Sequence, residues 1–295
     1  MATFSYKSIS TLRIGGQDFV WGDRTYVMGV VNATPDSFSG DGVLPVIGDV
    51  QQAVDQALRM EDEGADIIDV GGESTRPSSI YADAKPVEVD NEITRVIPVI
   101  EELSRRTGIP ISIDTRKAAV ADAAFAAGAS LVNDVSMLGD AEMPRMLANS
   151  GVPIIVSHIR QGGDDGDVVE NVLSDLNRSI EELATAGVER SNIIVDPGIG
   201  FAKSGAQSME MLRKITALRA ELVHPVLIGT SRKSFIGEVT GESIDDRRFG
   251  TAATVALAIQ GGADIVRVHD VREMVSVVKM SDALTRHRID GVPDA

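Results

Sequence analysis

The stretch Asn192-Ile-Ile-Val-Asp-Pro-Gly-Ile-Gly-Phe-Ala-Lys-Ser204 joins a short apolar run to a sharp turn. The apolar run is typical of a buried strand. It ends at Pro197, because proline cannot continue a strand ladder, and the two glycines that follow allow the backbone to turn tightly. Asp196 therefore stands at the exit of a predicted strand. One aspartate in such a place is most often a helix cap or a turn residue, but the same pattern recurs along the chain.

Strand-like runs alternate with helical segments from about residue 24 onward. The runs are 26–31, 66–70, 111–113, 130–132, 153–156, 193–195, 225–228 and 264–268, and the helical segments are 49–63, 91–106, 117–127, 141–149, 168–186, 207–222, 247–260 and 271–285. Glycine marks several turns from helix to strand, as at Gly64 and Gly128, where a helix end favours the left-handed conformation. Eight such units predict one α/β domain, a single closed (β/α)8 TIM barrel. The alternative is a doubly wound sheet, but Val31-Asn-Ala-Thr-Pro35 stands where that fold needs a glycine-rich turn.

The predicted barrel covers residues 24–285 and is flanked by two short segments. In residues 1–23, the runs Thr11-Leu-Arg-Ile14 and Gln17-Asp-Phe-Val20 flank Gly15-Gly16, which predicts an N-terminal β-hairpin extension. We expect this hairpin to cap the bottom of the domain. Residues 286–295 form a polar C-terminal tail that is expected to fray.

Composition limits the possible functions. The 295 residues are 43% hydrophobic, which is enough for a sizeable core. Acidic residues exceed basic ones by 44 to 28, giving a net charge of −16, which argues against binding to nucleic acid or to anionic membranes. The chain has no cysteine, which excludes disulfides, a thiolate nucleophile and a cysteine metal site. With no apolar signal region and no run long enough to span a bilayer, we expect a cytoplasmic protein.

Polar residues stand at the end of every predicted strand. They are Asn32; Glu73, Ser74, Thr75 and Arg76; Asp114 and Thr115; Asn133 and Asp134; Ser157 and His158; Asp196; Ser231, Arg232 and Lys233; and Arg267, His269 and Asp270. The carboxyl ends of barrel strands surround one pocket. Each residue alone is most simply a cap or a loop solvator, but so many at one rim predict a ligand site.

These residues fall into two chemical groups. Asp114, Asn133 and Asp196 suit a flat heterocycle with adjacent N–H donors, because buried acceptors need donors once water is excluded. The stretches Ser231-Arg-Lys233 and Arg267-Val-His269 supply positive charge in the quarter of a barrel that commonly binds phosphate. The amide oxygen of Asn32 suits a phosphate-bound Mg²⁺. The long loops 34–48 and 77–88 are typical of lids over a reactive intermediate, and equally of plain loops.

Taken together, the strand ends resemble those of the dihydropteroate synthases. The matching stretches are Val27-Met-Gly-Val-Val-Asn-Ala-Thr-Pro-Asp-Ser-Phe-Ser39, Asp69-Val-Gly-Gly-Glu-Ser-Thr-Arg-Pro77, Ser112-Ile-Asp-Thr115, Val132-Asn-Asp134, Val195-Asp-Pro-Gly-Ile-Gly-Phe-Ala-Lys203, Gly229-Thr-Ser-Arg-Lys-Ser234 and Arg267-Val-His-Asp270. They occur in order from about residue 24 to 285. The resemblance implies a TIM-barrel transferase, often a homodimer, that joins 6-hydroxymethyl-7,8-dihydropterin diphosphate to p-aminobenzoate in folate synthesis with Mg²⁺.

The resemblance also assigns expected roles to individual residues. It implies that Asp114, Asn133, Asp196 and Lys233 hold the pterin, that Asn32 binds Mg²⁺, that Thr75, Arg267 and His269 hold the diphosphate, and that Ser231, Phe201, Arg76 and Pro77 border p-aminobenzoate, where sulfonamides also sit. Lys233, Arg267 and His269 are the expected catalytic residues. Ser157-His158 departs from the usual Met-His, and Pro77-Ser-Ser79 stands where Gly-Ala is common. The acidic, glycine-rich segment 160–167 has no explanation in the sequence.

Two other functions are compatible with a pterin site. A pterin-binding methyltransferase domain, which moves a methyl group from methyltetrahydrofolate to a corrinoid, would share the carboxylates but has no use for the cationic cluster of residues 231–234 and 267–269. A non-catalytic pterin-binding paralogue is supported by Ser157 alone. The absence of cysteine agrees with a synthase, because the displacement of diphosphate needs no protein nucleophile.

Overall fold

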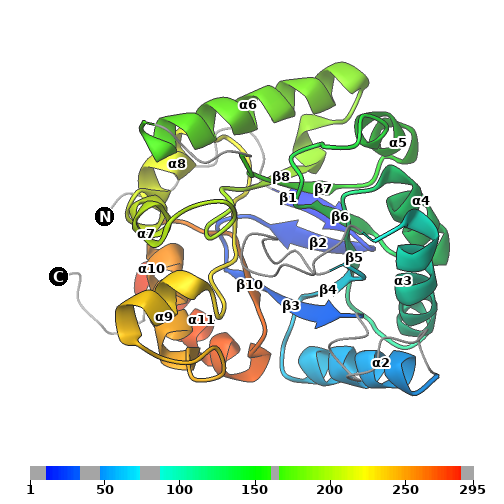
Figure 1. The fold of residues 1–295 in the computed structure, drawn as a ribbon, viewed down its shortest axis with the longest axis horizontal. Coiled ribbons are helices and arrows are strands. Elements are labelled where there is room, and N and C mark those ends of the chain that lie inside the picture. Colours follow the sequence, from blue (N-terminus) through cyan, green and yellow to red (C-terminus); the bar gives the residue numbers. More distant parts are fainter. Residues whose placement is uncertain (1–10, 34–46, 74–86, 161–165, 287–295) are drawn as a thin grey trace.

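The computed structural model describes residues 11–33, 47–73, 87–160 and 166–286. Parallel strands run in the spatial order β8-β7-β6-β5-β4-β3-β10-β9 and curve into a barrel ringed by helices (Figure 1). The strands are β3 (Tyr26–Asn32), β4 (Ile67–Gly71), β5 (Ile111–Asp114), β6 (Leu131–Asp134), β7 (Ile154–Ser157), β8 (Ile193–Asp196), β9 (Leu227–Ile228) and β10 (Ile265–Val268). In the described residues β8 and β9 join through the isolated bridge between Val195 and Val226. The predicted TIM barrel is therefore confirmed.

The helices that surround the sheet largely follow the predicted segments. They are α2 (Ile47–Asp62), α3 (Val89–Ser104), α4 (Ala118–Ala127), α5 (Met143–Ser150), α6 (Val168–Ala186), α7 (Gly205–Arg213), α8 (Ile215–Glu221), α9 (Ser234–Thr240), α10 (Arg248–Gln260) and α11 (Val271–Thr285), with a short 3-10 helix at Arg190–Asn192. None of the helices in the described part of the chain has the length and apolar character that a bilayer crossing requires.

Two details of the helix prediction are wrong. The segment 207–222 was expected to be one helix, but it is divided at Lys214, where φ is −105°. Beyond this break, α8 buries Ile215 and Leu218, each 1% exposed. Helix α9 was not predicted, because its seven residues are too short to show a helical period.

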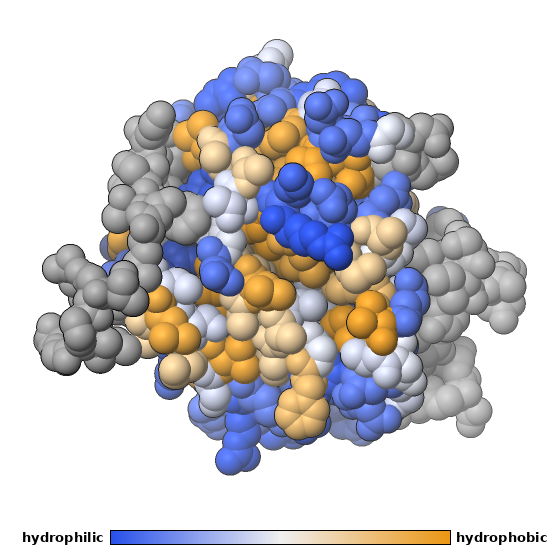
Figure 2. Space-filling view, turned by 90° about the vertical axis from the view of Figure 1, so that its left-hand side faces the viewer, coloured by the Kyte–Doolittle hydropathy of each residue, from blue (hydrophilic) through white to orange (hydrophobic). Residues whose placement is uncertain are grey.

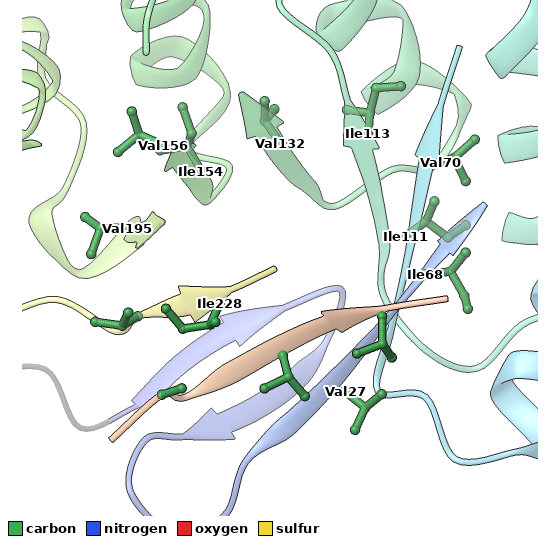
Figure 3. Packing of buried hydrophobic residues seen from close by; sticks show 14 of the residues in the cluster. Val27, Ile68, Val70, Ile111, Ile113, Val132, Ile154, Val156, Val195 and Ile228 are labelled. Carbon is green, nitrogen blue, oxygen red and sulfur yellow. The ribbon is translucent and has the colours of Figure 1, made fainter. Parts of the chain in front are cut away.

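Side chains alternate between the two faces of each strand, and the outward face packs on the helices. Figure 3 shows outward residues of this kind, among them Ile68, Val70, Ile113, Val156 and Val195, which belong to the large core between sheet and helices. The inward residues near the N-terminal end of the barrel form a second apolar cluster that includes Met28, Ile67, Leu131, Ile155, Ile194, Leu227 and Ile265. Because strands have a period of two, the next inward residue lies two positions later.

That next inward position is polar on five strands. Ile67 is followed by Asp69, Leu131 by Asn133, Ile155 by Ser157, Ile194 by Asp196, and Ile265 by Arg267. The interior is therefore apolar toward the N-terminal ends of the strands and polar toward their carboxyl ends. This layering positions the site.

The predicted hairpin is present as β1 (Thr11–Ile14) and β2 (Gln17–Val20). It is more than an appendage, because Leu12, Ile14, Phe19 and Trp21 belong to the same apolar cluster as the inward barrel residues. The ring centroids of Phe19 and Tyr26 lie 4.6 Å apart, and those of Trp21 and Tyr26 lie 5.6 Å apart. The hairpin thus closes the N-terminal end of the barrel, as expected. Residues 1–10 and 287–295 lie outside the described residues.

Candidate active site

Arg267, on β10, lies at the centre of the polar layer. Its Nε donates to Asp69 Oδ2 at 2.6 Å, and one terminal nitrogen donates to Asp114 Oδ2 at 2.7 Å. The three residues come from β10, β4 and β5, so the contacts cross the barrel interior. Burial works against the charged guanidinium, but the two carboxylates outweigh it and raise the pKa of Arg267. The pocket therefore holds a cation that stays charged at any physiological pH.

Asp196 and Lys233 form a second part of the pocket, next to the seam between β8 and β9. Asp196 Oδ1 accepts from the backbone N–H of Gly198 at 2.8 Å, and the Ser157 hydroxyl donates to its Oδ2 at 3.3 Å. Lys233 Nζ lies 3.6 Å from the centroid of the Phe201 ring, within the range of a cation–π contact. Ser157, which departs from the family pattern, therefore contacts a carboxylate in place of the apolar contact that methionine would make.

Burial shifts the pKa values of several pocket groups toward neutrality, among them that of Asp196, which it raises. Burial raises the pKa of Asp114 to about 7, although Arg267 opposes the shift. Burial lowers the pKa of Lys233 to about 8, although Asp196 opposes it. Groups that titrate near pH 7 inside a pocket are typical of binding and catalytic sites.

His269 is held in its neutral form. Its backbone N–H donates to Ser231 Oγ at 3.2 Å, and its ring Nδ1 lies 3.0 Å from the same oxygen. In the tautomer with its hydrogen on Nε2, the ring would accept the Ser231 hydroxyl proton at Nδ1 and present Nε2–H to a ligand. Burial, reinforced by Arg267, lowers the pKa of His269 to about 4. At neutral pH the ring is therefore uncharged.

The structure places some of the other predicted site residues, and the remainder lie outside the part of the chain that it describes. Asn133 lies in the polar layer, where its Nδ2 donates to Asp69 Oδ2 at 2.9 Å. Asn32 ends β3 with an exposed side chain, beside Gly71 of β4. Thr75, Arg76 and Pro77 lie outside the described residues, as do both predicted lid loops for most of their length.

Arg232 shows that a strand-end cation is not always a pocket residue. It adopts φ of +59°, and its guanidinium donates to both carboxylate oxygens of Asp270, at 3.1 and 2.6 Å. The pair sits beside α10, because the Arg232 backbone N–H also donates to Thr251 Oγ1 at 3.1 Å. Of the cationic stretch 231–233, it is Lys233 that contacts Phe201 in the pocket.

Sequence reasoning missed two sets of residues around the site. The first is Asp69, which is fully buried and holds both Arg267 and Asn133. Asp69 lies two residues before the end of β4, and the alternation from Ile67 to Asp69 indicates an inward carboxylate.

The second missed set supports the loop that carries Phe201. Lys203 Nζ lies 2.8 Å from His158 Nδ1 and donates to the carbonyls of Gly198 and Phe201 at 3.2 and 3.3 Å. His158 Nε2 in turn lies 3.2 Å from Asp175 Oδ2 on α6. A lysine that donates to two carbonyls of one loop and contacts His158 after β7 holds that loop against its neighbour. These contacts depend on tertiary structure that no local pattern reveals.

The segment 160–167 acquires a partial explanation. Arg160 Nε donates to Asp175 Oδ2 at 3.0 Å, and Asp167 caps α6 by accepting from the backbone N–H groups of Val169 and Glu170 at 2.8 and 3.2 Å. Residues 161–165 lie outside the described part of the chain.

The architecture and the site define a class of protein. A (β/α)8 barrel with buried carboxylates and cations at the carboxyl ends of its strands is a barrel enzyme with a polar small-molecule site. The chain belongs to the family described as pterin binding enzymes, whose sequence profile matches residues 28–269, and within that family to the dihydropteroate synthases.

Individual relatives support this assignment. The chain is 46% identical over 263 residues to a dihydropteroate synthase of Bacillus subtilis (strain 168), covering 89% of each chain. It superposes with a TM-score of 0.86 and 40% identity on a Xanthomonas albilineans dihydropteroate synthase bound to 4-aminobenzoic acid, covering 97% of this chain and 100% of that one. A structure of the Xanthomonas albilineans enzyme in complex with 7,8-dihydropteroate gives a TM-score of 0.82 at 37% identity, covering 96% and 100%.

Proposed function

We propose that this protein joins 6-hydroxymethyl-7,8-dihydropterin diphosphate to p-aminobenzoate, releasing diphosphate and 7,8-dihydropteroate. The observation that carries the proposal is the polar layer itself, in which buried carboxylates and an amide lie beside Arg267. The carboxylates and the amide suit a pterin ring, and the Arg267 guanidinium suits its diphosphate. Relatives that span nearly the whole chain and bind 4-aminobenzoic acid or dihydropteroate support the same reaction.

The pterin is assigned to Asp114, Asn133, Asp196 and Lys233. A carboxylate accepts from adjacent ring N–H groups, and a lysine ammonium donates to a ring carbonyl or nitrogen. Asp114, Asn133 and Asp196 lie at the ends of strands, and Lys233 is the N-cap residue of α9, so both kinds of partner stand on regular elements of the scaffold. Their depth matters because hydrogen bonds are stronger where water is excluded.

The diphosphate is assigned to Arg267 and His269, with Thr75 as a further expected contact. Arg267 contributes full positive charge, and His269 contributes a neutral Nε2–H. Asn32 fits a Mg²⁺ ion that is mainly held by phosphate oxygens and water, because its exposed amide oxygen is a hard ligand that leaves the rest of the coordination shell open. Such an ion would neutralise part of the charge on the diphosphate when bound.

The p-aminobenzoate is assigned to the outer side of the pocket, bordered by Phe201 and Ser231. The backbone carbonyl of Phe201 accepts from Lys203, and its ring contacts Lys233, so the ring adjoins both proposed substrate positions. Arg76 and Pro77, expected to complete this position, lie outside the described residues. Sulfonamides, which imitate p-aminobenzoate, are proposed to compete here.

The chemistry follows from these positions. The bond between the pterin methylene carbon and the diphosphate oxygen breaks, and its electron pair leaves with the diphosphate. Arg267 and the His269 N–H stabilise the charge that develops on that oxygen. Asp114 and Asp196 offset the positive charge left on the pterin. The lone pair of the arylamine then forms the new carbon–nitrogen bond, and the amine loses a proton.

A coupled assay of diphosphate release tests this function. We expect diphosphate to be released from the pterin diphosphate at a rate that p-aminobenzoate increases, with dihydropteroate formed in equal amount. A methyltransferase domain would release no diphosphate. A silent binder would bind the pterin without turnover. A rate of diphosphate release that does not depend on p-aminobenzoate would contradict the proposal.

We also propose that the protein is a cytoplasmic homodimer that associates through α10 and neighbouring helices. Phe249 is 83% exposed, and Leu257, Met280 and Leu284 are each more than half exposed on α10 and α11. Figure 2, which views the side of the molecule where α9 and α10 lie, shows apolar residues across the middle of that face. Sedimentation should give a dimer for the natural chain and a monomer for Phe249→Asp. A monomeric natural chain would contradict the proposal.

A further inference from the structure

We propose that Asp69 is a positioning residue that orients Asn133 and Arg267 for substrate. This inference rests on the proposed function, since it assigns a shared support to a pterin-binding and a diphosphate-binding side chain. Asp69 lies on β4 with no exposed surface. One of its oxygens, Oδ2, accepts from Arg267 Nε at 2.6 Å and from Asn133 Nδ2 at 2.9 Å.

The three residues come from strands that are not neighbours. In the sheet, β4 is separated from β6 by β5 and from β10 by β3. Asp69 therefore reaches across the interior to both sides, and one carboxylate oxygen ties together two parts of the pocket. No backbone ladder sets the relative position of β6 and β10, so the carboxylate is the direct link between their side chains.

The carboxylate decides which way the Asn133 amide faces. Asp69 Oδ2 accepts from Asn133 Nδ2, so the amide presents its nitrogen to Asp69. Its oxygen, Oδ1, then points elsewhere, and it is buried with no hydrogen-bond partner in the described residues. A buried acceptor without a donor is costly, and a ligand N–H would remove that cost. Asp69 thus makes Asn133 an acceptor toward the pterin.

The same carboxylate holds Arg267 by its inner nitrogen. With Nε on Asp69, the two terminal nitrogens remain for other partners, and one of them contacts Asp114. When the pterin takes over Asp114, the tether keeps the guanidinium in place for the diphosphate. A substrate diphosphate therefore meets a guanidinium that is already oriented.

The test is Asp69→Asn, which keeps the shape but replaces an obligate acceptor with an amide that also donates. The bare 6-hydroxymethyl pterin should bind about 10- to 100-fold more weakly, since a hydrogen bond to a charged group and the amide orientation are both lost. The pterin diphosphate should lose more than the bare pterin, because Arg267 is also released. The KM for p-aminobenzoate should stay unchanged, which a general loosening of the fold would not allow.

Asp264→Asn is the matched control. Asp264 is also fully buried and on the same barrel, but at its N-terminal end, where it accepts from the backbone N–H of Val226 at 2.9 Å. We expect this variant to bind both pterin ligands like the natural protein, whatever its stability. Equal losses in the two variants would overturn the proposal.

Asn133→Ala separates failure of this inference from failure of the proposed function. If Asn133→Ala binds the pterin more weakly but Asp69→Asn binds it with the affinity of the unsubstituted protein, the inference is overturned. The assignment of the pterin site is then unaffected. Natural binding in both variants overturns the pterin assignment as well. In a double-mutant cycle, the two changes should be non-additive, because both remove the same Asn133 acceptor.

A measurement on the natural protein covers the case in which Asp69→Asn does not fold. The side-chain NH₂ of Asn133 should give a resolved, slowly exchanging amide signal in the free protein. That signal should persist when the bare pterin binds, because the ligand contacts Oδ1 and leaves Nδ2 on Asp69. Loss of the Asn133 NH₂ signal from its Asp69-bound position on pterin binding would overturn the proposal.

Discussion

Buried carboxylates occur at both ends of the barrel, and they are satisfied differently. At the N-terminal end, Asp282 accepts from the backbone N–H and the hydroxyl of Thr25, both at 2.7 Å, and Asp264 accepts from the backbone of Val226. At the opposite end, Asp69 Oδ1 and Asn133 Oδ1 are buried without a hydrogen-bond partner among the described residues.

Burial depth alone does not separate the two ends. Burial raises the pKa of Asp264 to about 7, the same value as for Asp114 in the pocket. The difference lies in the partners. At the N-terminal end, backbone groups and side chains from distant segments complete the hydrogen bonds, which ties the fold together. At the carboxyl end, the Asn133 oxygen is left for a ligand, so the site is arranged at some expense of stability.

The largest expected effect comes from exchanging the arginine of each end for alanine. Arg267→Ala should lower kcat/KM for the pterin diphosphate on the order of 30- to 5,000-fold, because it leaves buried carboxylates unpaired. This factor corresponds to a loss of about 2–5 kcal/mol in transition-state stabilisation. Arg219, which lies 3.5 Å from Asp264, belongs to the N-terminal end. Arg219→Ala should instead lower the free energy of unfolding by about 3 kcal/mol.

Urea unfolding and the diphosphate-release assay measure the two quantities for both variants. Arg219→Ala should keep natural kcat/KM in the folded protein. The comparison between the two ends breaks down if each variant changes stability and activity in the same proportion. Binding of the bare pterin to Arg267→Ala should be affected much less than binding of its diphosphate.

A smaller effect is expected from Gly198, in the loop after β8. Its φ is +68°, and an added Cβ would lie 1.9 Å from the carbonyl oxygen of His158. Gly16, in the hairpin, has φ of +86° but nothing within 4 Å of an added Cβ. Gly16→Ala should therefore lose only about 1–2 kcal/mol of stability, which is the cost of an alanine in the left-handed conformation.

Gly198→Ala should lose more stability than Gly16→Ala, and it should also raise the KM for p-aminobenzoate roughly tenfold, because the displaced loop carries Phe201. Thermal unfolding and steady-state kinetics give both numbers. Equal stability losses in the two alanine variants, with no change in KM, would show that the His158 contact does not matter.

The pH dependence of pterin binding tests the shifted groups of the pocket. Asp114 must be ionised to accept from the pterin, so affinity should rise as pH increases through about 7. Lys233 must be protonated to donate, so affinity should fall as pH increases through about 8. Calorimetric titration of the bare pterin should therefore give a maximum between these values, with each limb approaching about tenfold per pH unit.

Lys233→Arg provides the control for the alkaline limb, because a guanidinium does not titrate in this range. The fall above pH 8 should disappear in that variant, while the rise through about 7 remains. An alkaline limb that survives in Lys233→Arg would assign it to another group.

The smallest effect is expected at Trp21, one exception to the pattern at the N-terminal end. Its Nε1 is buried without a hydrogen-bond partner in the described residues. Trp21→Phe removes that donor and keeps an aromatic ring against Tyr26, so the lost packing and the relieved donor should nearly cancel, within about 1 kcal/mol. A loss above about 3 kcal/mol in urea unfolding would show that the indole N–H is satisfied.

Most of the fold was predictable from the sequence, because each strand is a short apolar run bounded by turns and each helix shows its period. The break at Lys214 was not, because neither glycine nor proline marks it and the burial of Ile215 depends on the completed barrel. Helix α9 was missed for lack of length.

The site residues that stand at strand ends could be predicted from the sequence, and the others could not. Asp114, Asn133, Asp196 and Arg267 follow from strand ends that converge on one pocket. Asp69 required attention to the inward position two residues after Ile67. The outward turn of Arg232 toward Asp270, and the contact of Lys203 with His158, arise from tertiary structure, so no local pattern marks them.

The seam between β8 and β9 has a consequence for the motions of the pocket. The two strands meet at a single bridge, with the Val195 N–H donating to Pro225 at 2.9 Å, whereas β7 and β8 pair over four residues. Amide hydrogens near Val195 and Val226 should therefore exchange with solvent through local opening more readily than those inside the β3–β4 ladder. Asp196 and Lys233 flank this opening on opposite sides. A pterin that contacts both would join them across it, and the slowing of exchange at Val195 would report how tightly the ligand holds the barrel shut.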